Sequence, residues 1–383
     1  MEDPFELPPD VLRRIPLFAE LSKVLAWSGG AVNWDIGTQV AISMAAGSAP
    51  DPAVDAADAA AVAEHVRVAQ MWLTAATGLP EPHSPTDAHA VTPIGWVEGT
   101  RDRIAELIDP VAAKLTSALA EQAGDGAPAG GLQQALGQIA PMLMGVQAGT
   151  ILGTLAREVT GSHELGFPAA SDPVSLVVPT IDRVAEEYEL DAALVRQTVA
   201  LHAEADRMFY GGISFARARF FSLFHNYIAT LRFDFSESMR RLQELDIGNP
   251  EAMQSALGDQ TLFAPETSPQ TQRAAEAVGS FIALVQAHIE AAVASAGTRA
   301  GDIARVEEAF RRRAASGATG VAMLKGFLGI DDAPYRTRAR AFVRGALGAA
   351  DWETLLRAWE DPEAFPREEE LDDPTAWVGR IAR

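Results

Sequence analysis

Apolar residues recur at intervals of three and four along most of the chain, which is the spacing of helices that bury one face. The period-two alternation that indicates strands is scarce. The pattern therefore predicts a mainly α fold. The helices that it predicts cover about residues 9–27, 34–46, 53–77, 93–108, 110–121, 181–188, 191–202, 270–295 and 303–315.

Signals for strands and loops are confined to a few segments. Leu176, Val177 and Val178 form a β-prone run that ends at Pro179, which predicts one or two short strands. Proline-rich residues 78–92 and the Gly/Ala-rich stretch from Ala123 to Gly131 predict loops.

The domain organisation follows from length and composition. The chain has 383 residues, of which 48% are hydrophobic, so it can bury a sizeable core. No repeat of fixed period and no clear linker is evident. We expect one mainly helical domain over residues 1–383, with a helical part (1–122) and a second part (132–383) as its possible subdivision.

One charge-free segment raises the question of a membrane helix. Residues 126–156 hold no charged side chain, and Gly145, Gly149 and Gly153 are spaced four apart, as in closely packed membrane helices. Four glutamines and a proline within the segment disfavour insertion into a bilayer. We therefore expect no membrane span here, but a buried helix whose glycines allow a neighbour to approach closely.

The charge balance and the lack of cysteine exclude several classes of function. With 31 basic and 52 acidic side chains the net charge is −21, which disfavours binding to nucleic acids and to anionic membranes. The absence of cysteine excludes disulfides, thiolate zinc sites and iron–sulfur clusters. The first residues, from Met1 to Glu6, lack the features of a secretory signal, so we expect a cytoplasmic protein.

The clearest candidate for chemistry is a pair of polar residues on one predicted helix. His202 and Asp206 are four positions apart, so their side chains lie on the same helix face, beside apolar residues such as Val199 and Phe209. A carboxylate buried there is costly unless it is paired or coordinated. One interpretation is metal ligation by the pair, and the other is a His–Asp hydrogen bond inside a core.

Metal-dependent hydrolysis also needs a base that deprotonates the metal-bound water. In a zinc-binding HExxH helix, that base is the Glu directly after the first His. The corresponding residue here is Ala203, which cannot accept a proton. Glu204 lies about 100° further round the helix, so it should point away from His202.

A second predicted helix carries a comparable pair. Gln286 and Glu290 are again four apart, beside apolar Ile282, Val285 and Ile289. Glutamate is a good metal ligand and glutamine a weak one. The alternative interpretation is an amphipathic helix with polar residues at the border of its apolar face.

Taken together, these segments resemble the zincin-like family of mostly actinobacterial hydrolases, which are labelled zinc-dependent metallopeptidases; some relatives are linked to deazaflavin-coenzyme biosynthesis. The resemblance runs nearly from end to end. The segments that carry it, in order, are Val32-Asn33-Trp34-Asp35, Ala69-Gln70-Met71-Trp72-Leu73, Gly145 to Val159, Leu176-Val177-Val178-Pro179, Arg311-Arg312-Arg313, Tyr335-Arg336, Arg340-Ala341-Phe342-Val343, Glu370-Leu371-Asp372-Asp373-Pro374 and Trp377.

The resemblance implies a mainly α zincin-like fold with a few short strands, an HExxH helix and a downstream Glu as third zinc ligand. His202 matches the first His, but Ala203 replaces the catalytic Glu and Asp206 the second His. Gln286 stands at the presumed third-ligand position, and Glu290 matches an acidic position one turn on. The resemblance therefore implies a degenerate metal site, whose candidate ligands are His202, Asp206 and Glu290.

Three hypotheses about function remain open at this point. The first is a catalytically silent pseudoenzyme that binds an unidentified protein or small molecule, with no cofactor. The second is a metal-dependent hydrolase with an atypical His/Asp/Glu site, for which zinc is the possible cofactor. The third is a purely structural role for the His202–Asp206 pair in a scaffold protein. The sequence is compatible with a homo-oligomer and does not decide whether the chain is an enzyme.

Overall fold

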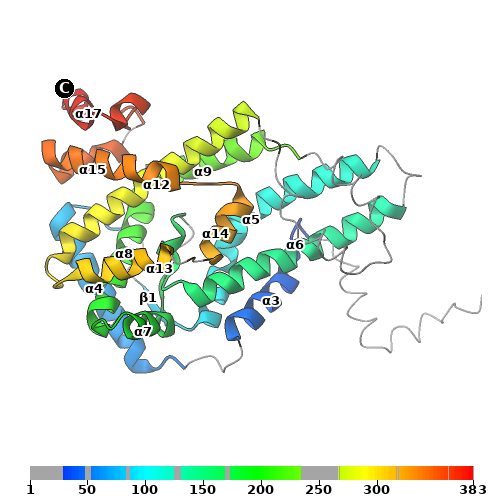
Figure 1. The fold of residues 1–383 in the computed structure, drawn as a ribbon, viewed down its shortest axis with the longest axis horizontal. Helices are drawn as coiled ribbons and strands as arrows, with labels where there is room; N and C mark the ends of the chain where they lie inside the picture. The colour runs from blue at the N-terminus through cyan, green and yellow to red at the C-terminus, as the bar shows by residue number, and fades with distance from the viewer. Residues whose placement is uncertain are drawn as a thin grey trace, which may run out of the picture. The chain divides into compact units, whose positions relative to one another are not determined.

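The structure is a computed structural model (Figure 1), and it does not describe every residue. The predicted helix at residues 9–27 and most of the predicted loop at 123–131 lie outside the described part. The described residues are 29–47, 53–82, 87–124, 131–168, 173–233, 266, 268–315, 317, 319–360 and 362–382.

Helices make up nearly all of the regular structure, which confirms the predicted mainly α class (Figure 1). The helices are α3 (Trp34–Ala46), α4 (Ala56–Thr77), α5 (Pro93–Gly124), α6 (Gly131–Glu158), α7 (Val178–Glu187), α8 (Ala192–Gly212), α9 (Ser214–Thr230), α12 (Pro269–Gly297), α13 (Ile303–Ala315), α14 (Thr319–Leu328), α15 (Arg336–Ala349), α16 (Trp352–Leu356) and α17 (Pro374–Ile381). Short 3₁₀ helices are η1 (Ser162–Leu165), η3 (Ala333–Tyr335), η4 (Arg357–Trp359) and η5 (Glu368–Leu371).

Local sequence sets several of these boundaries. Asp55 accepts hydrogen bonds from the first backbone amides of α4 and forms a capping box with Asp58. Gly78 ends the same helix with a φ of +68°, a left-handed conformation that favours glycine. Asp191 caps α8, as predicted, by accepting a hydrogen bond from the amide of Leu194 at 2.8 Å.

Several elements differ from the sequence prediction. Helix α8 continues to Gly212, beyond the predicted end at residue 202, and helices α9 and α14 to α17 were not among the predicted helices. The segments expected to be separate helices on either side of Asp109 form the single helix α5, which continues through Pro110. A strand, β1 (Ala88–Val91), lies inside the segment predicted to be a loop, and it pairs in parallel with β2 (Val174–Val177). The β1 sequence has weak strand propensity, so its conformation comes from pairing with a distant segment.

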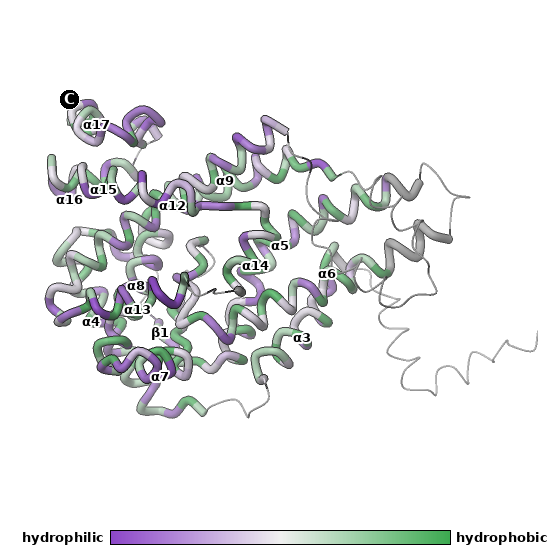
Figure 2. The backbone as a smooth tube through the Cα atoms, in the orientation of Figure 1, coloured by the Kyte–Doolittle hydropathy of each residue, from purple (hydrophilic) through white to green (hydrophobic). Residues whose placement is uncertain are grey.

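The chain divides into two compact units, and neither is one continuous segment. The first comprises Met1–Val40, Ile108–Thr150 and Leu231–Glu266, and the second Ala41–Leu107, Ile151–Thr230 and Thr267–Arg383. The expected single domain over 1–383 stays a prediction. Hydrophobic and hydrophilic stretches alternate along the helices of the chain (Figure 2), as the periodicity indicated.

The glycines of α6 have the role that their spacing predicts. Within the first unit, Gly145 lies so close to α3 that a Cβ there would be 2.3 Å from the carbonyl oxygen of Asn33. A Cβ at Gly149 would be equally close to the carbonyl oxygen of Gly37. In the same unit, the indole of Trp34 donates a hydrogen bond to Asp109 at 2.8 Å. Glycine is therefore required where the backbones of α3 and α6 meet.

In the second unit, α8 is the central helix. It packs against α4, α12, α7, α13 and α9, which surround it in the ribbon view (Figure 1). Nearly every residue of α8 from Val195 to Tyr210 is buried. The two-stranded sheet and η1 also contact α8. This placement brings segments far apart in sequence to the helix that carries the candidate pair.

Two described segments are long and apolar enough to cross a membrane, namely Ile139–Glu158 and Pro269–Gly297. In the most apolar stretch of each segment, 50% and 67% of the residues, respectively, are buried inside the structure. Two such helices are weak evidence for a membrane protein, because buried core helices have the same length and composition.

The close contact between α3 and α6 gives a first prediction. Replacing Gly145 with Ala should lower the free energy of unfolding by about 1–3 kcal/mol, because the new Cβ meets a backbone atom that cannot rotate away. The matched control is Gly99→Ala in α5, where a Cβ would meet nothing within 4 Å. That control should be neutral, or stabilising by up to about 1 kcal/mol. Urea denaturation measures both, and equal stabilities of Gly145→Ala and the parent would contradict the close approach.

Candidate functional site

The candidate site is built on α8, whose surroundings leave its polar side chains little access to water. A helix buried on most sides must satisfy its polar groups from within the protein, because each unpaired group keeps its desolvation cost. Gln197 illustrates this, since its side-chain oxygen lies 2.8 Å from Nδ1 of His65. The remaining polar residues in the middle of the helix are His202, Glu204, Asp206 and Arg207.

Glu204 and Arg207 form a buried ion pair. The guanidinium donates two hydrogen bonds to the carboxylate, Nε to Oε2 at 2.8 Å and Nη2 to Oε1 at 2.7 Å, and both side chains are 1% exposed or less. The bidentate pairing offsets the desolvation cost of burying the two charges. Glu204 is thus held by Arg207 rather than directed at His202, which agrees with the predicted direction of its side chain.

His202 is paired with a residue from another helix. Its Nε2 lies 2.6 Å from Oε1 of Glu307, which α13 contributes. Burial opposes a charge on His202, but the charge and hydrogen bond of Glu307 outweigh it and raise the pKa of His202 above its ordinary value. Burial likewise opposes the charge on Glu307, and His202 nevertheless lowers the pKa of Glu307. Each side chain therefore favours the charged form of the other, as in an imidazolium–carboxylate pair.

Asp206 is buried without a hydrogen-bond partner among the described residues. Its side chain is 1% exposed, and neither carboxylate oxygen is bonded. The His202–Asp206 hydrogen bond considered from the sequence is therefore wrong, because His202 bonds to Glu307 instead. Burial raises the pKa of Asp206 well above its ordinary value, which favours the protonated acid. One turn on, the buried hydroxyl of Tyr210 also has no partner in the described chain.

The two members of the second predicted pair, on α12, have different surroundings. Glu290 accepts two hydrogen bonds at 2.6 Å from Arg340 of α15, a bidentate ion pair. Gln286 lies beside Gly166, at the end of η1, and its buried side-chain nitrogen has no partner among the described residues. Glu290 is thus engaged by an arginine rather than free to act as a ligand.

His288 lies on a different face of α12 from this pair. It is buried against Trp359 and Phe209, and its Nδ1 lies 2.7 Å from the carbonyl oxygen of Leu284. Burial lowers the pKa of His288 to about 4, so it is neutral at physiological pH. It belongs to the aromatic core rather than to the candidate site.

The structure adds His163, which the sequence did not single out. The ring of His163, in η1, stacks on that of His202 with centroids 6.0 Å apart and an angle of 20° between the planes. Burial lowers the pKa of His163 well below its ordinary value, and the charges on His202 and Arg313 lower it further. The contact of η1 with α8 brings the two histidines together. They are 39 positions apart in the sequence, so no helical spacing predicts that they meet.

The side chains at the predicted metal positions do not fit a zinc ion in this arrangement. In the described part of the chain, no three His, Asp or Glu side chains are grouped to hold a metal. Nε2 of His202 is bonded to Glu307 and the carboxylate of Glu290 to Arg340, whereas both oxygens of Asp206 have no partner among the described residues. Structural and catalytic zinc sites need at least three protein ligands. The metal set of His202, Asp206 and Glu290 stays a prediction.

Comparisons with known proteins agree with the resemblance found in the sequence. The profile of the zincin-like metallopeptidase family matches residues 32–378. A crystal structure from Chloroflexus aurantiacus, described as "a putative hydrolase with a novel fold", is similar with a TM-score of 0.66 and 18% identity. The match covers 92% of this chain and 99% of that one, and at this identity it shows a shared fold alone. No curated protein matches the chain.

The His202–Glu307 pair predicts a pH-dependent contribution to stability. Because the folded pKa of His202 is raised, the contribution is fully present below about pH 6.5, the ordinary value for histidine, and is lost as pH rises through the folded pKa. Glu307→Gln should therefore lower the free energy of unfolding by about 2 kcal/mol at pH 6 and by less at pH 9.

The matched control is Glu308→Gln, which alters an exposed glutamate paired with exposed Arg311 and Arg312. It should change stability by less than about 0.5 kcal/mol at either pH. Chemical denaturation at the two pH values gives the comparison. A Glu307→Gln effect that is equal at pH 6 and pH 9 would show that His202 is not the charged partner.

Proposed function

We propose a catalytically silent, ligand- or protein-binding role for this chain, which belongs to the zincin-like metallopeptidase family. The observation that carries the proposal is the residue after His202. Ala203 stands where the family has its general base, and the neighbouring Glu204 is held in a buried ion pair with Arg207. Neither Ala203 nor Glu204 is thus placed to deprotonate a water beside His202.

The pairing of His202 supports the same conclusion. A zinc ligand must offer a neutral imidazole nitrogen with a free lone pair. Glu307 holds Nε2 of His202 at 2.6 Å and favours the protonated ring, in which that nitrogen has no lone pair to offer. The bidentate contact of Glu290 with Arg340 similarly occupies the acidic side chain of α12.

The second candidate is a metal-dependent hydrolase with an atypical site. One observation favours it, namely that both oxygens of the buried Asp206 are unpaired within the described residues. A carboxylate left without partners in a protein interior is unusual, and coordination of a cation is one way to compensate it. This candidate requires His202 to leave Glu307 and requires a base that the described site does not supply.

Metal content and peptide hydrolysis, measured together, separate the two candidates. The purified protein, incubated with zinc and desalted, should retain far less than one zinc per chain by elemental analysis. It should also cleave fluorescein-labelled casein no faster than a His202→Ala control. Stoichiometric zinc that disappears in His202→Ala, or casein hydrolysis that the same substitution abolishes, would refute the silent role.

Restoring the family residues tests whether the scaffold of the zinc site persists. The triple variant Ala203→Glu, Asp206→His, Gln286→Glu should bind about one zinc per chain, because it regains two His and one Glu ligands on α8 and α12. The control carries Ala203→Glu alone and should bind no more zinc than the parent. If a folded triple variant fails to bind zinc, α8 and α12 do not present these positions to one another as the family resemblance implies.

A further inference from the structure

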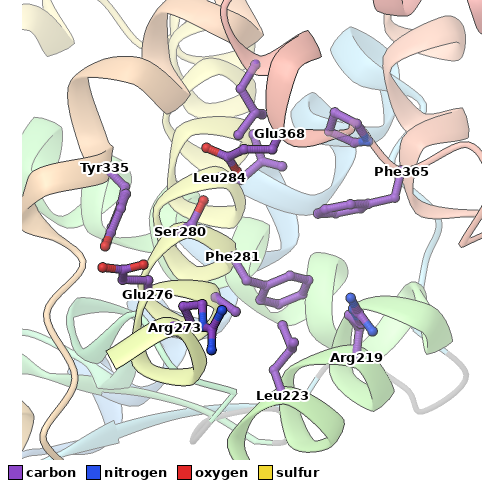
Figure 3. A pocket seen from close by; sticks show the side chains of 13 residues that line it. Arg219, Leu223, Arg273, Glu276, Ser280, Phe281, Leu284, Tyr335, Phe365 and Glu368 are labelled. Carbon is purple, nitrogen blue, oxygen red and sulfur yellow. The ribbon is translucent and has the colours of Figure 1, made fainter. Parts of the chain in front are cut away.

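A cavity in the second unit lies away from the degenerate zinc position. It has a volume of about 360 Å³ and is lined by residues of α9, α12, η3 and the segment 365–371 (Figure 3). This volume is in the range of sites for small organic molecules. The residues that α12 contributes, from Arg273 to Leu284, recur at helical spacing on one face of that helix. Gln286 and Glu290 are not part of that face.

One side of the cavity is formed by packed apolar side chains. Phe281 stacks on Phe365 with ring centroids 6.0 Å apart and an angle of 23° between the planes. Trp359 packs edge-on against both rings, with centroid distances of 5.7 Å to Phe281 and 5.4 Å to Phe365. Leu223 completes this side in the close-up view (Figure 3). The arrangement offers a preformed surface for a flat or aliphatic group.

Two arginines at the cavity have unused hydrogen-bond donors. Arg219 of α9 makes no hydrogen bond or ion pair with any described residue, and Arg273 of α12 uses only Nε, which donates to the carbonyl oxygen of Pro269 at 3.1 Å. Both side chains flank the ring of Phe281 and the side chain of Leu223 (Figure 3). Both arginines are exposed, so their free donors face solvent at the cavity, where a dissolved anion can reach them.

The acidic residues of the cavity do not neutralise Arg219. Glu368 is held by Arg338, and Glu276 accepts a hydrogen bond from Gln272 at 3.1 Å. Glu276 lies beside Tyr335, at the end of the cavity opposite Arg219 (Figure 3). The end beside Arg219 therefore favours an anion, and the rest of the cavity favours an apolar body.

We propose that this cavity binds a small organic anion, in which a carboxylate or phosphate group is joined to an aromatic or aliphatic body. The guanidinium of Arg219 would bind the anionic group, for which its planar fork of donors is suited. Phe281 and Phe365 would pack against the body of the ligand. The inference rests on the ligand-binding part of the proposed function, but it involves none of the residues at the zinc position.

Isothermal titration of the full chain with 1-naphthaleneacetate tests this inference. The probe should bind, Arg219→Gln should weaken its affinity about tenfold or more, and raising the salt concentration should weaken it as well. The matched control is Arg305→Gln, which removes an exposed arginine of α13 outside the cavity and should leave the affinity unchanged. The neutral 1-naphthaleneacetamide should bind at least tenfold more weakly than the acid. A parallel titration with 1-naphthyl phosphate shows which anionic group is preferred.

Three results would overturn the inference. These are no binding of either anion up to about 1 mM, equal affinities of Arg219→Gln and Arg305→Gln, and equal affinities for the acid and the amide. A second variant, Ser280→Phe, fills the cavity from the middle of α12 and should abolish binding even if Arg219→Gln proves poorly folded. Zinc binding by the parent chain would refute the silent role without changing these titrations, so the two proposals can fail separately.

Discussion

The burial of α8 is the constraint on which the candidate site depends. A helix surrounded by α4, α12 and α13 cannot leave its polar side chains to water, so each has to find a partner inside the protein or lose its charge. Glu204 and Arg207 satisfy one another, and His202 is satisfied by Glu307. Asp206 has no partner among the described residues, and its raised pKa is the consequence.

The function proposed here separates the fold of the family from its chemistry. The family profile extends over residues 32–378, and the similar crystal structure spans 92% of the chain, so the scaffold is retained almost completely. The side chains on which zinc chemistry relies are replaced or paired with other residues. Meanwhile another face of α12 lines a cavity whose arginines have no carboxylate partners among the described residues. The same helix thus connects a degenerate metal position with a candidate ligand site.

Local patterns predicted part of the helices, but α9 and α14 to α17 were missed. Helices α3 and α13 begin and end where the periodicity placed them, and the glycines of α6 mark a close helix contact, because both features depend on neighbouring residues. The strand β1 and the pairs of His202 with Glu307 and His163 were not predictable. These contacts join residues far apart in sequence, and no spacing rule connects them. The replacement of the HExxH glutamate by Ala203, by contrast, is visible in the sequence because HExxH is a local motif, and the loss of a general base that it implies stays a prediction.

The protonation state of His202 in solution shows whether its Nε2 is available to bind zinc. Nitrogen-15 NMR of histidine-labelled protein, with the His202 signals assigned from a His202→Gln variant, reads both ring nitrogens directly. Our account predicts an imidazolium at pH 7 whose signals do not move when zinc is added, because Glu307 holds Nε2. A neutral ring whose Nε2 signal shifts on stoichiometric zinc addition would contradict it and would show that the metal position is intact.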